Sequence, residues 1–133
     1  MNNSASPELF YLALTAGLTG TLWMAYIVNR IRENGVLATL KTPDLDTPPQ
    51  ASWAYRLMRA HGNAVENLVV FSALVLAVQF SHVNSEMTAT AACVFFYARL
   101  AHALTYTMGI PVLRTLAFFV GFICQAILFV QFI

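Results

Sequence analysis

Residues 56–71 have the sequence RLMRAHGNAVENLVVF, in which two arginines, an asparagine and a glutamate lead directly into an apolar segment. That segment has no Asp, Glu, Lys or Arg from Asn67 to Ser85, which is enough to cross a hydrocarbon core of about 30 Å. An ionisable side chain inside a membrane costs about 2.5–3.5 kcal/mol on insertion scales, so it usually faces a protein interior and marks a site. This stretch therefore predicts a membrane helix with a polar face at one end.

The whole chain has the composition of a membrane protein. Of its 133 residues, 59% are hydrophobic and only 10% are charged, whereas a soluble domain carries about 25% charged residues. A net charge of +1 does not suggest a nucleic-acid partner, and we expect none. Cys93 and Cys124 both lie in apolar stretches, so we expect buried thiols, with neither a disulfide framework nor a metal site.

Four apolar segments predict four membrane-spanning helices, over about residues 9–29, 56–82, 87–107 and 113–133. No Lys or Arg precedes the first segment, as would be needed in a secretory signal peptide, so we expect that segment to be a retained span. A polar loop over about residues 30–55 follows it, with a short surface helix within 35–41. The predicted fold is all-α: a single domain over residues 1–133, folded as an up-down four-helix membrane bundle.

The basic residues predict the orientation of this bundle. Those in or beside the first and third loops are Arg30, Arg32, Lys41, Arg56, Arg59 and Arg114. By the positive-inside rule these loops are cytoplasmic and both termini lie outside. We therefore expect a multi-pass integral membrane protein with its polar residues near the cytoplasmic side.

Polar side chains fall on one face of each predicted helix near that side. At 100° per residue, those of the second span lie within about 80° and those of the third within about 60°. His61 points away from them, and we expect it to be structural. The residues on these faces are Arg56, Arg59, Asn63 and Glu66 in the second span, Arg99, His102 and Tyr106 in the third, Arg114 and Gln125 in the fourth, and Arg30 at the end of the first.

Part of this pattern has a structural explanation. Arg30, Arg56 and Arg114 are near enough to an interface to reach lipid head groups, and Arg99 with Glu66 would form a structural ion pair. That pair leaves the other polar residues on the same faces unexplained. We therefore expect a ligand site as well.

The charges of this site favour an anionic ligand. Five arginines accompany one carboxylate, Glu66, and a guanidinium binds a carboxylate through two parallel hydrogen bonds. Glu66 provides an acceptor for an amine. Two carboxylates with one ammonium are the charges of glutathione, which we expect as the co-substrate, while the lipid-facing side would admit a hydrophobic partner.

Three segments of the sequence resemble the membrane-associated proteins in eicosanoid and glutathione metabolism (MAPEG): RAHGNAVEN at 59–67, ARLAHALTY at 98–106 and LRTLAFFVG at 113–121. The likeness is strongest to the microsomal glutathione transferase and prostaglandin E synthase branch, and it covers about residues 55–125. It implies a homotrimer with three glutathione sites between adjacent subunits near the cytoplasmic side. The other implied partners are membrane lipids and a hydrophobic small-molecule or lipid substrate.

The same resemblance implies roles for individual residues. Arg114 matches the arginine to which stabilisation of the thiolate is assigned, and Thr115 follows it where the synthase branch has a serine. Arg30 is the best match for the basic residue that ends the first helix, with Arg32 as its rival. The residues that match glutathione-binding positions are Arg30, Arg56, Arg59, Asn63, Glu66, Arg99, His102 and Tyr106.

Three positions depart from the family pattern. Ala64 stands where this branch has an Asp, while Asn67 and His102 stand where leukotriene-forming members have Tyr. We therefore expect a membrane-bound glutathione transferase or peroxidase that acts on hydrophobic electrophiles or lipid hydroperoxides, and not an eicosanoid-forming enzyme.

Two other classes of protein compete with this interpretation. A non-catalytic MAPEG-like protein that binds glutathione or a lipid would lose Arg114 or Glu66, and both are present. A small four-span exporter would carry an acidic residue in the middle of its first span to couple protons, and Leu9–Val28 has none.

Overall fold

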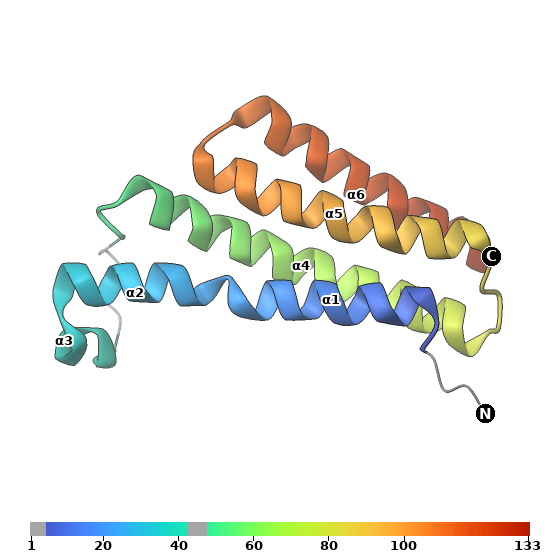
Figure 1. Ribbon diagram of the computed structural model, residues 1–133, viewed down its shortest axis with the longest axis horizontal. Helices are drawn as coiled ribbons and strands as arrows, with labels where there is room; N and C mark the ends of the chain where they lie inside the picture. The colour runs from blue at the N-terminus through green and yellow to red at the C-terminus, as the bar shows by residue number, and fades with distance from the viewer. Residues whose placement is uncertain (1–4, 43–47) are drawn as a thin grey trace.

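The computed structural model describes residues 5–42 and 48–133, so residues 43–47 of the predicted loop lie outside the described part. The helices are α1 (Pro7–Thr21), α2 (Trp23–Asn34), α3 (Val36–Leu40), α4 (Ser52–Phe80), α5 (Glu86–Met108) and α6 (Pro111–Phe132), and the described residues contain no strand. Four helical segments run alternately up and down (Figure 1), and each is long and apolar enough to cross a membrane. The predicted all-α four-helix membrane fold is confirmed.

The first of these segments consists of α1 and α2, which continue each other around Leu22 (Figure 1). There the Leu22 N–H donates to Thr19 O at 3.4 Å, a tighter turn than the α-helical one. The segment ends at Asn34, because Gly35 follows with a φ of 80°, a conformation that favours glycine. It therefore extends beyond residue 29, since hydropathy marks where charges begin and not where the helix stops. The short helix α3 lies within the stretch expected for it.

The core lies where α5 packs against α1, α4 and α6. At its centre Phe71 of α4 stacks on Phe95 of α5, with ring centroids 3.9 Å apart, and both side chains are fully buried. Val75 and Leu128 pack beside them, with Ala92 on α5. Small residues such as Ala92 allow membrane helices to approach closely, where packing replaces the hydrophobic effect as the main attraction.

Hydrogen bonds join the helices at the end of the bundle that holds both termini (Figure 1). The Ser6 hydroxyl donates to Gln79 Oε1 at 2.7 Å. The Thr88 hydroxyl donates to the carboxylate of Glu8, a side chain that is only 1% exposed. These bonds tie the start of α1 to α4 and α5. Helical periodicity does not reveal the role of Glu8, because its partner Thr88 belongs to a helix far along the sequence.

The opposite end is joined in a similar way. The Tyr26 hydroxyl lies 2.8 Å from His61 Nδ1 and links α2 to α4, a contact of the kind that a structural histidine makes. The Glu33 carboxylate accepts from the backbone N–H groups of Gln50 and Ala51 at 3.2 and 3.0 Å. It thereby holds the backbone directly before α4, which begins at Ser52 and has no side-chain bond at its N-cap.

Candidate functional site

Arg99 lies at the centre of the predicted polar faces. Its side chain extends from α5 and is only 3% exposed. Nη2 donates to Asn63 Oδ1 of α4 at 2.6 Å and lies 3.4 Å from His102 Nδ1. Nε and Nη1 are buried without a hydrogen-bond partner, and a buried donor left unpaired costs about 1–3 kcal/mol, or more when it is charged. Arg99 thus has two donor atoms for which the described residues supply no acceptor.

Two further amide side chains, those of Asn67 and Gln125, bond around Asn63, the partner of Arg99. Asn67 Nδ2, one helical turn on, donates to Asn63 O at 2.9 Å and lies 3.3 Å from Asn63 Oδ1. Gln125 Nε2 of α6 in turn donates to Asn67 O at 3.2 Å. The contact between Asn67 Nδ2 and Asn63 Oδ1 helps to hold this side-chain oxygen where Arg99 donates to it. Sequence reasoning treated Asn67 only as a departure from the family, although its spacing of four from Asn63 would have revealed the contact.

The partner of Arg99 on α4 is Asn63 and not Glu66, so the ion pair that would explain Arg99 as a structural residue is not the contact that forms. Glu66 is exposed on α4. Its carboxylate is therefore accessible to a ligand or to another chain and is not used to neutralise Arg99. The structural ion pair does not account for the burial of Arg99.

Arg114 joins this group from the start of α6. Its guanidinium carbon lies 4.5 Å from the centre of the Tyr106 ring, a distance at which the cation is attracted to the face of the ring. Tyr106 also meets His102 edge-on, with ring centroids 5.5 Å apart. Arg59 of α4, an exposed side chain, lies beside Tyr106. We call the continuous set Asn63, Arg99, His102, Tyr106 and Arg114 the polar row.

Besides the exposed Arg59 and Glu66 of α4, three residues predicted for the site lie outside the polar row. Arg56 Nε donates to Thr107 O at 2.9 Å, so it satisfies a carbonyl at the end of α5 that has no helical partner. Thr115 is exposed, and its hydroxyl donates to Pro111 O of its own helix at 2.9 Å. Arg30 is half-buried on α2, a helix that packs against α3 and α4.

There is a physical reason why each of these three residues lies outside the polar row. Arg56 lies near the turn between α5 and α6, and that turn cannot be built from periodicity alone. Thr115 follows Arg114 directly and therefore points about 100° away from it. Arg30 and its exposed rival Arg32 belong to a helix at the edge of the bundle. Within one chain these side chains do not extend the polar row.

The fold and the polar row define a class of protein: a four-span membrane bundle with a buried cationic site near one end. A family model described as the MAPEG family matches residues 9–133, and the chain belongs to this family. Searches of curated proteins and of solved structures each found no significant match. Membership of the family supports a function of the membrane glutathione and eicosanoid type.

Proposed function

We propose that this protein is a membrane-bound glutathione transferase or peroxidase of the microsomal glutathione transferase and prostaglandin E synthase branch. In this proposal it is a single MAPEG domain that assembles as a homotrimer. The observation that carries the proposal is the buried guanidinium of Arg99, which has two unpartnered nitrogen atoms. A carboxylate of glutathione has the negative charge and an acceptor oxygen for either of these nitrogens, which lie on different edges of the guanidinium.

The residues around Arg99 would divide the remaining contacts to glutathione. Asn63 and His102 hold the guanidinium in position, and Arg59 is the exposed cation for the second carboxylate. The exposed carboxylate of Glu66 accepts from the ammonium group. Arg30 lies on α2, which packs against α3 and α4, and would act from the neighbouring copy in the trimer. Arg56, already bonded to a helix end, contributes mainly its charge.

Arg114 would stabilise the thiolate. A free thiol has a pKa of about 8.5, and only the thiolate is nucleophilic. Lowering that pKa to about 6.5 requires about 2.7 kcal/mol of differential stabilisation. One guanidinium about 4 Å from the sulfur contributes about 4 kcal/mol at an effective dielectric constant near 20. Arg114 alone is therefore sufficient, and it is held over Tyr106 at the end of the polar row.

A hydroxyl group would donate a hydrogen bond to the same sulfur, and two residues compete for this role. Thr115 is the counterpart of the family's serine, but its hydroxyl bonds to the Pro111 carbonyl in a single chain. Tyr106 already lies under Arg114, so we favour Tyr106 as the donor. The electrophile would be a hydrophobic compound or a lipid hydroperoxide that reaches the site from the membrane.

The test replaces Arg99 with leucine and measures binding of glutathione to the purified protein by calorimetry. Arg99→Leu removes the proposed carboxylate partner, and we expect binding to weaken at least about tenfold. Replacing a buried and incompletely paired charge by an apolar side chain is often neutral or stabilising, so the thermal midpoint without glutathione should not fall. Lys41→Leu, at an exposed cation outside the polar row, is the control. Equal affinity in the two variants would overturn the proposal.

A further inference from the structure

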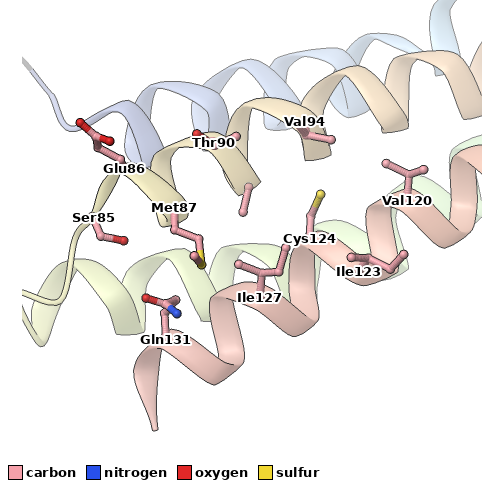
Figure 2. A pocket seen from close by; sticks show the side chains of 11 residues that line it. Ser85, Glu86, Met87, Thr90, Val94, Val120, Ile123, Cys124, Ile127 and Gln131 are labelled. Atoms are coloured by element: carbon pink, nitrogen blue, oxygen red, sulfur yellow. The ribbon is translucent and has the colours of Figure 1, made fainter.

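A groove runs between α5 and α6 in the half of the bundle that holds both termini (Figures 1 and 2). Its volume is about 750 Å³, within the range of roughly 300–1,000 Å³ that ligand pockets occupy. Apolar side chains such as Val94 of α5 and Val120 of α6 form its walls. Figure 2 shows the thiol of Cys124 directed from α6 toward α5. The groove shares no residue with the polar row.

Polar groups line only one end of this groove. Ser85 and Glu86 lie at the start of α5, and Gln131 lies in the last turn of α6, so the three form one mouth (Figure 2). From Glu86 to Val94 the helix rises about 12 Å. That length is close to half of a hydrocarbon core of about 30 Å, which is the depth filled by the chains of one leaflet. The groove therefore has the polarity and the length of an amphiphile with its head at the helix ends.

The charge at the mouth selects the head group. Glu86 is exposed, and the described residues that line the groove include neither Lys nor Arg. All seven Lys and Arg residues of the chain lie toward the opposite end of the bundle. An anionic head would be repelled by Glu86, whereas an ammonium group would be attracted. We propose that this groove binds a membrane lipid with an ammonium head group, with one acyl chain between Val94 and Val120 and its head at Glu86.

A second copy of the chain fits the groove less well. A helix with its side chains is about 10–12 Å across, and seating one here would remove Glu86 from water. Copies that share one orientation in the membrane have their Lys and Arg residues at the same end, far from Glu86. A second copy therefore offers no Lys or Arg side chain to this carboxylate, whereas a lipid head offers an ammonium group. The proposal does not depend on glutathione.

The experiment uses the full chain in nanodiscs that contain equal amounts of phosphatidylethanolamine and phosphatidylglycerol with the same acyl chains. Native mass spectrometry then measures which lipid the released protein retains. We expect about a tenfold preference for phosphatidylethanolamine. Val120→Trp fills the groove and should abolish retention. Val130→Trp makes the same change on the same helix outside the groove, at a side chain that is 61% exposed, and should retain the lipid.

Two further measurements keep the proposal testable. Glu86→Gln should reduce the preference between the two head groups while a lipid is still retained. A photo-crosslinker in place of Met87, which lines the groove, should form an adduct with phosphatidylethanolamine, and this readout replaces Val120→Trp if that variant does not fold. Equal retention of the two lipids by the wild-type protein, equal loss in the two tryptophan variants, or an adduct with a second copy of the chain would each overturn the proposal.

Discussion

Arg99 and Asn63 form the contact on which the polar row is built. Asn63 is a neutral partner at 2.6 Å, so it orients Arg99 without cancelling its charge. A carboxylate at the same position would pair with the guanidinium permanently and would compete with an anionic ligand. Because residue 63 is an amide, the positive charge of Arg99 remains available to an anionic ligand.

A substitution at Asn63 tests whether leaving Arg99 without a charged partner lowers stability and favours glutathione binding. We expect Asn63→Asp to raise the thermal midpoint in detergent, because it pairs the buried charge of Arg99, and to weaken glutathione binding at least about tenfold. Asn34→Asp, at an exposed asparagine that ends α2 outside the polar row, is the matched control. Unchanged affinity in Asn63→Asp would show that Arg99 does not bind the anion.

Glu66 is the proposed acceptor for the ammonium group of glutathione. Because its side chain is exposed, we expect Glu66→Ala to leave the thermal midpoint nearly unchanged and to raise the dissociation constant for glutathione about tenfold. Glu86→Ala removes another exposed acid, at the other end of the bundle, and should have no effect on this binding. If the two variants bind glutathione equally well, Glu66 does not recognise the amine.

At the scale of the elements, the turn between α5 and α6 sets where Arg114 lies. Gly109 has a φ of 78° and ends α5, and Pro111 begins α6, the usual positions of these residue types. A Cβ on Gly109 would lie 3.2 Å from Arg56 Cζ. Arg56 therefore covers the turn while it bonds to Thr107 O, and it helps to hold the start of α6 beside the end of α5.

A double-mutant cycle tests that packing. Gly109→Ala should destabilise the protein by about 1–2 kcal/mol, through its left-handed backbone and its contact with Arg56. With the arginine removed in Arg56→Ala, the steric part of this cost disappears, so we expect a coupling energy of about 0.5–1 kcal/mol between the two sites. The measurement is the stability of the four proteins to denaturation in detergent. Strict additivity would mean that Arg56 does not support the turn.

The sequence predicted the helices and their polar faces well, because both depend on local rules. The spacing of Arg99, His102 and Tyr106 along α5 is enough to place them on one face. The contacts of Arg56, Thr115 and Glu8 could not be predicted in the same way. They depend on how a helix end meets a neighbouring helix, and small shifts there decide which partner a side chain reaches.

At the scale of the whole molecule, polar groups lie toward both ends of an apolar core. One end has the buried guanidinium of Arg99, and the other has the buried carboxylate of Glu8. The aromatic pair Phe71 and Phe95 separates them. The proposed glutathione site and the proposed lipid groove therefore occupy opposite halves of the bundle.

The proposed homotrimer would complete the glutathione site with Arg30 from a neighbouring copy. We expect native mass spectrometry to find trimers and a detergent that dissociates them to abolish glutathione binding. Arg30→Ala should weaken this binding about tenfold while the trimer persists, with Arg32→Ala as the control at an exposed position of the same helix. Isolated monomers that bind glutathione with full affinity would contradict the shared site.

The most direct test of the proposed function is the ultraviolet absorbance of the thiolate when glutathione is added to the purified protein at neutral pH. We predict that the wild-type protein forms the thiolate and that Arg114→Ala does not, although the variant binds glutathione within a few-fold of the wild type and loses most of its turnover. Arg32→Ala, with its arginine outside the polar row, should behave as the wild type. Glutathione bound by the wild-type protein without any thiolate would contradict the account and would indicate a binding protein in place of an enzyme.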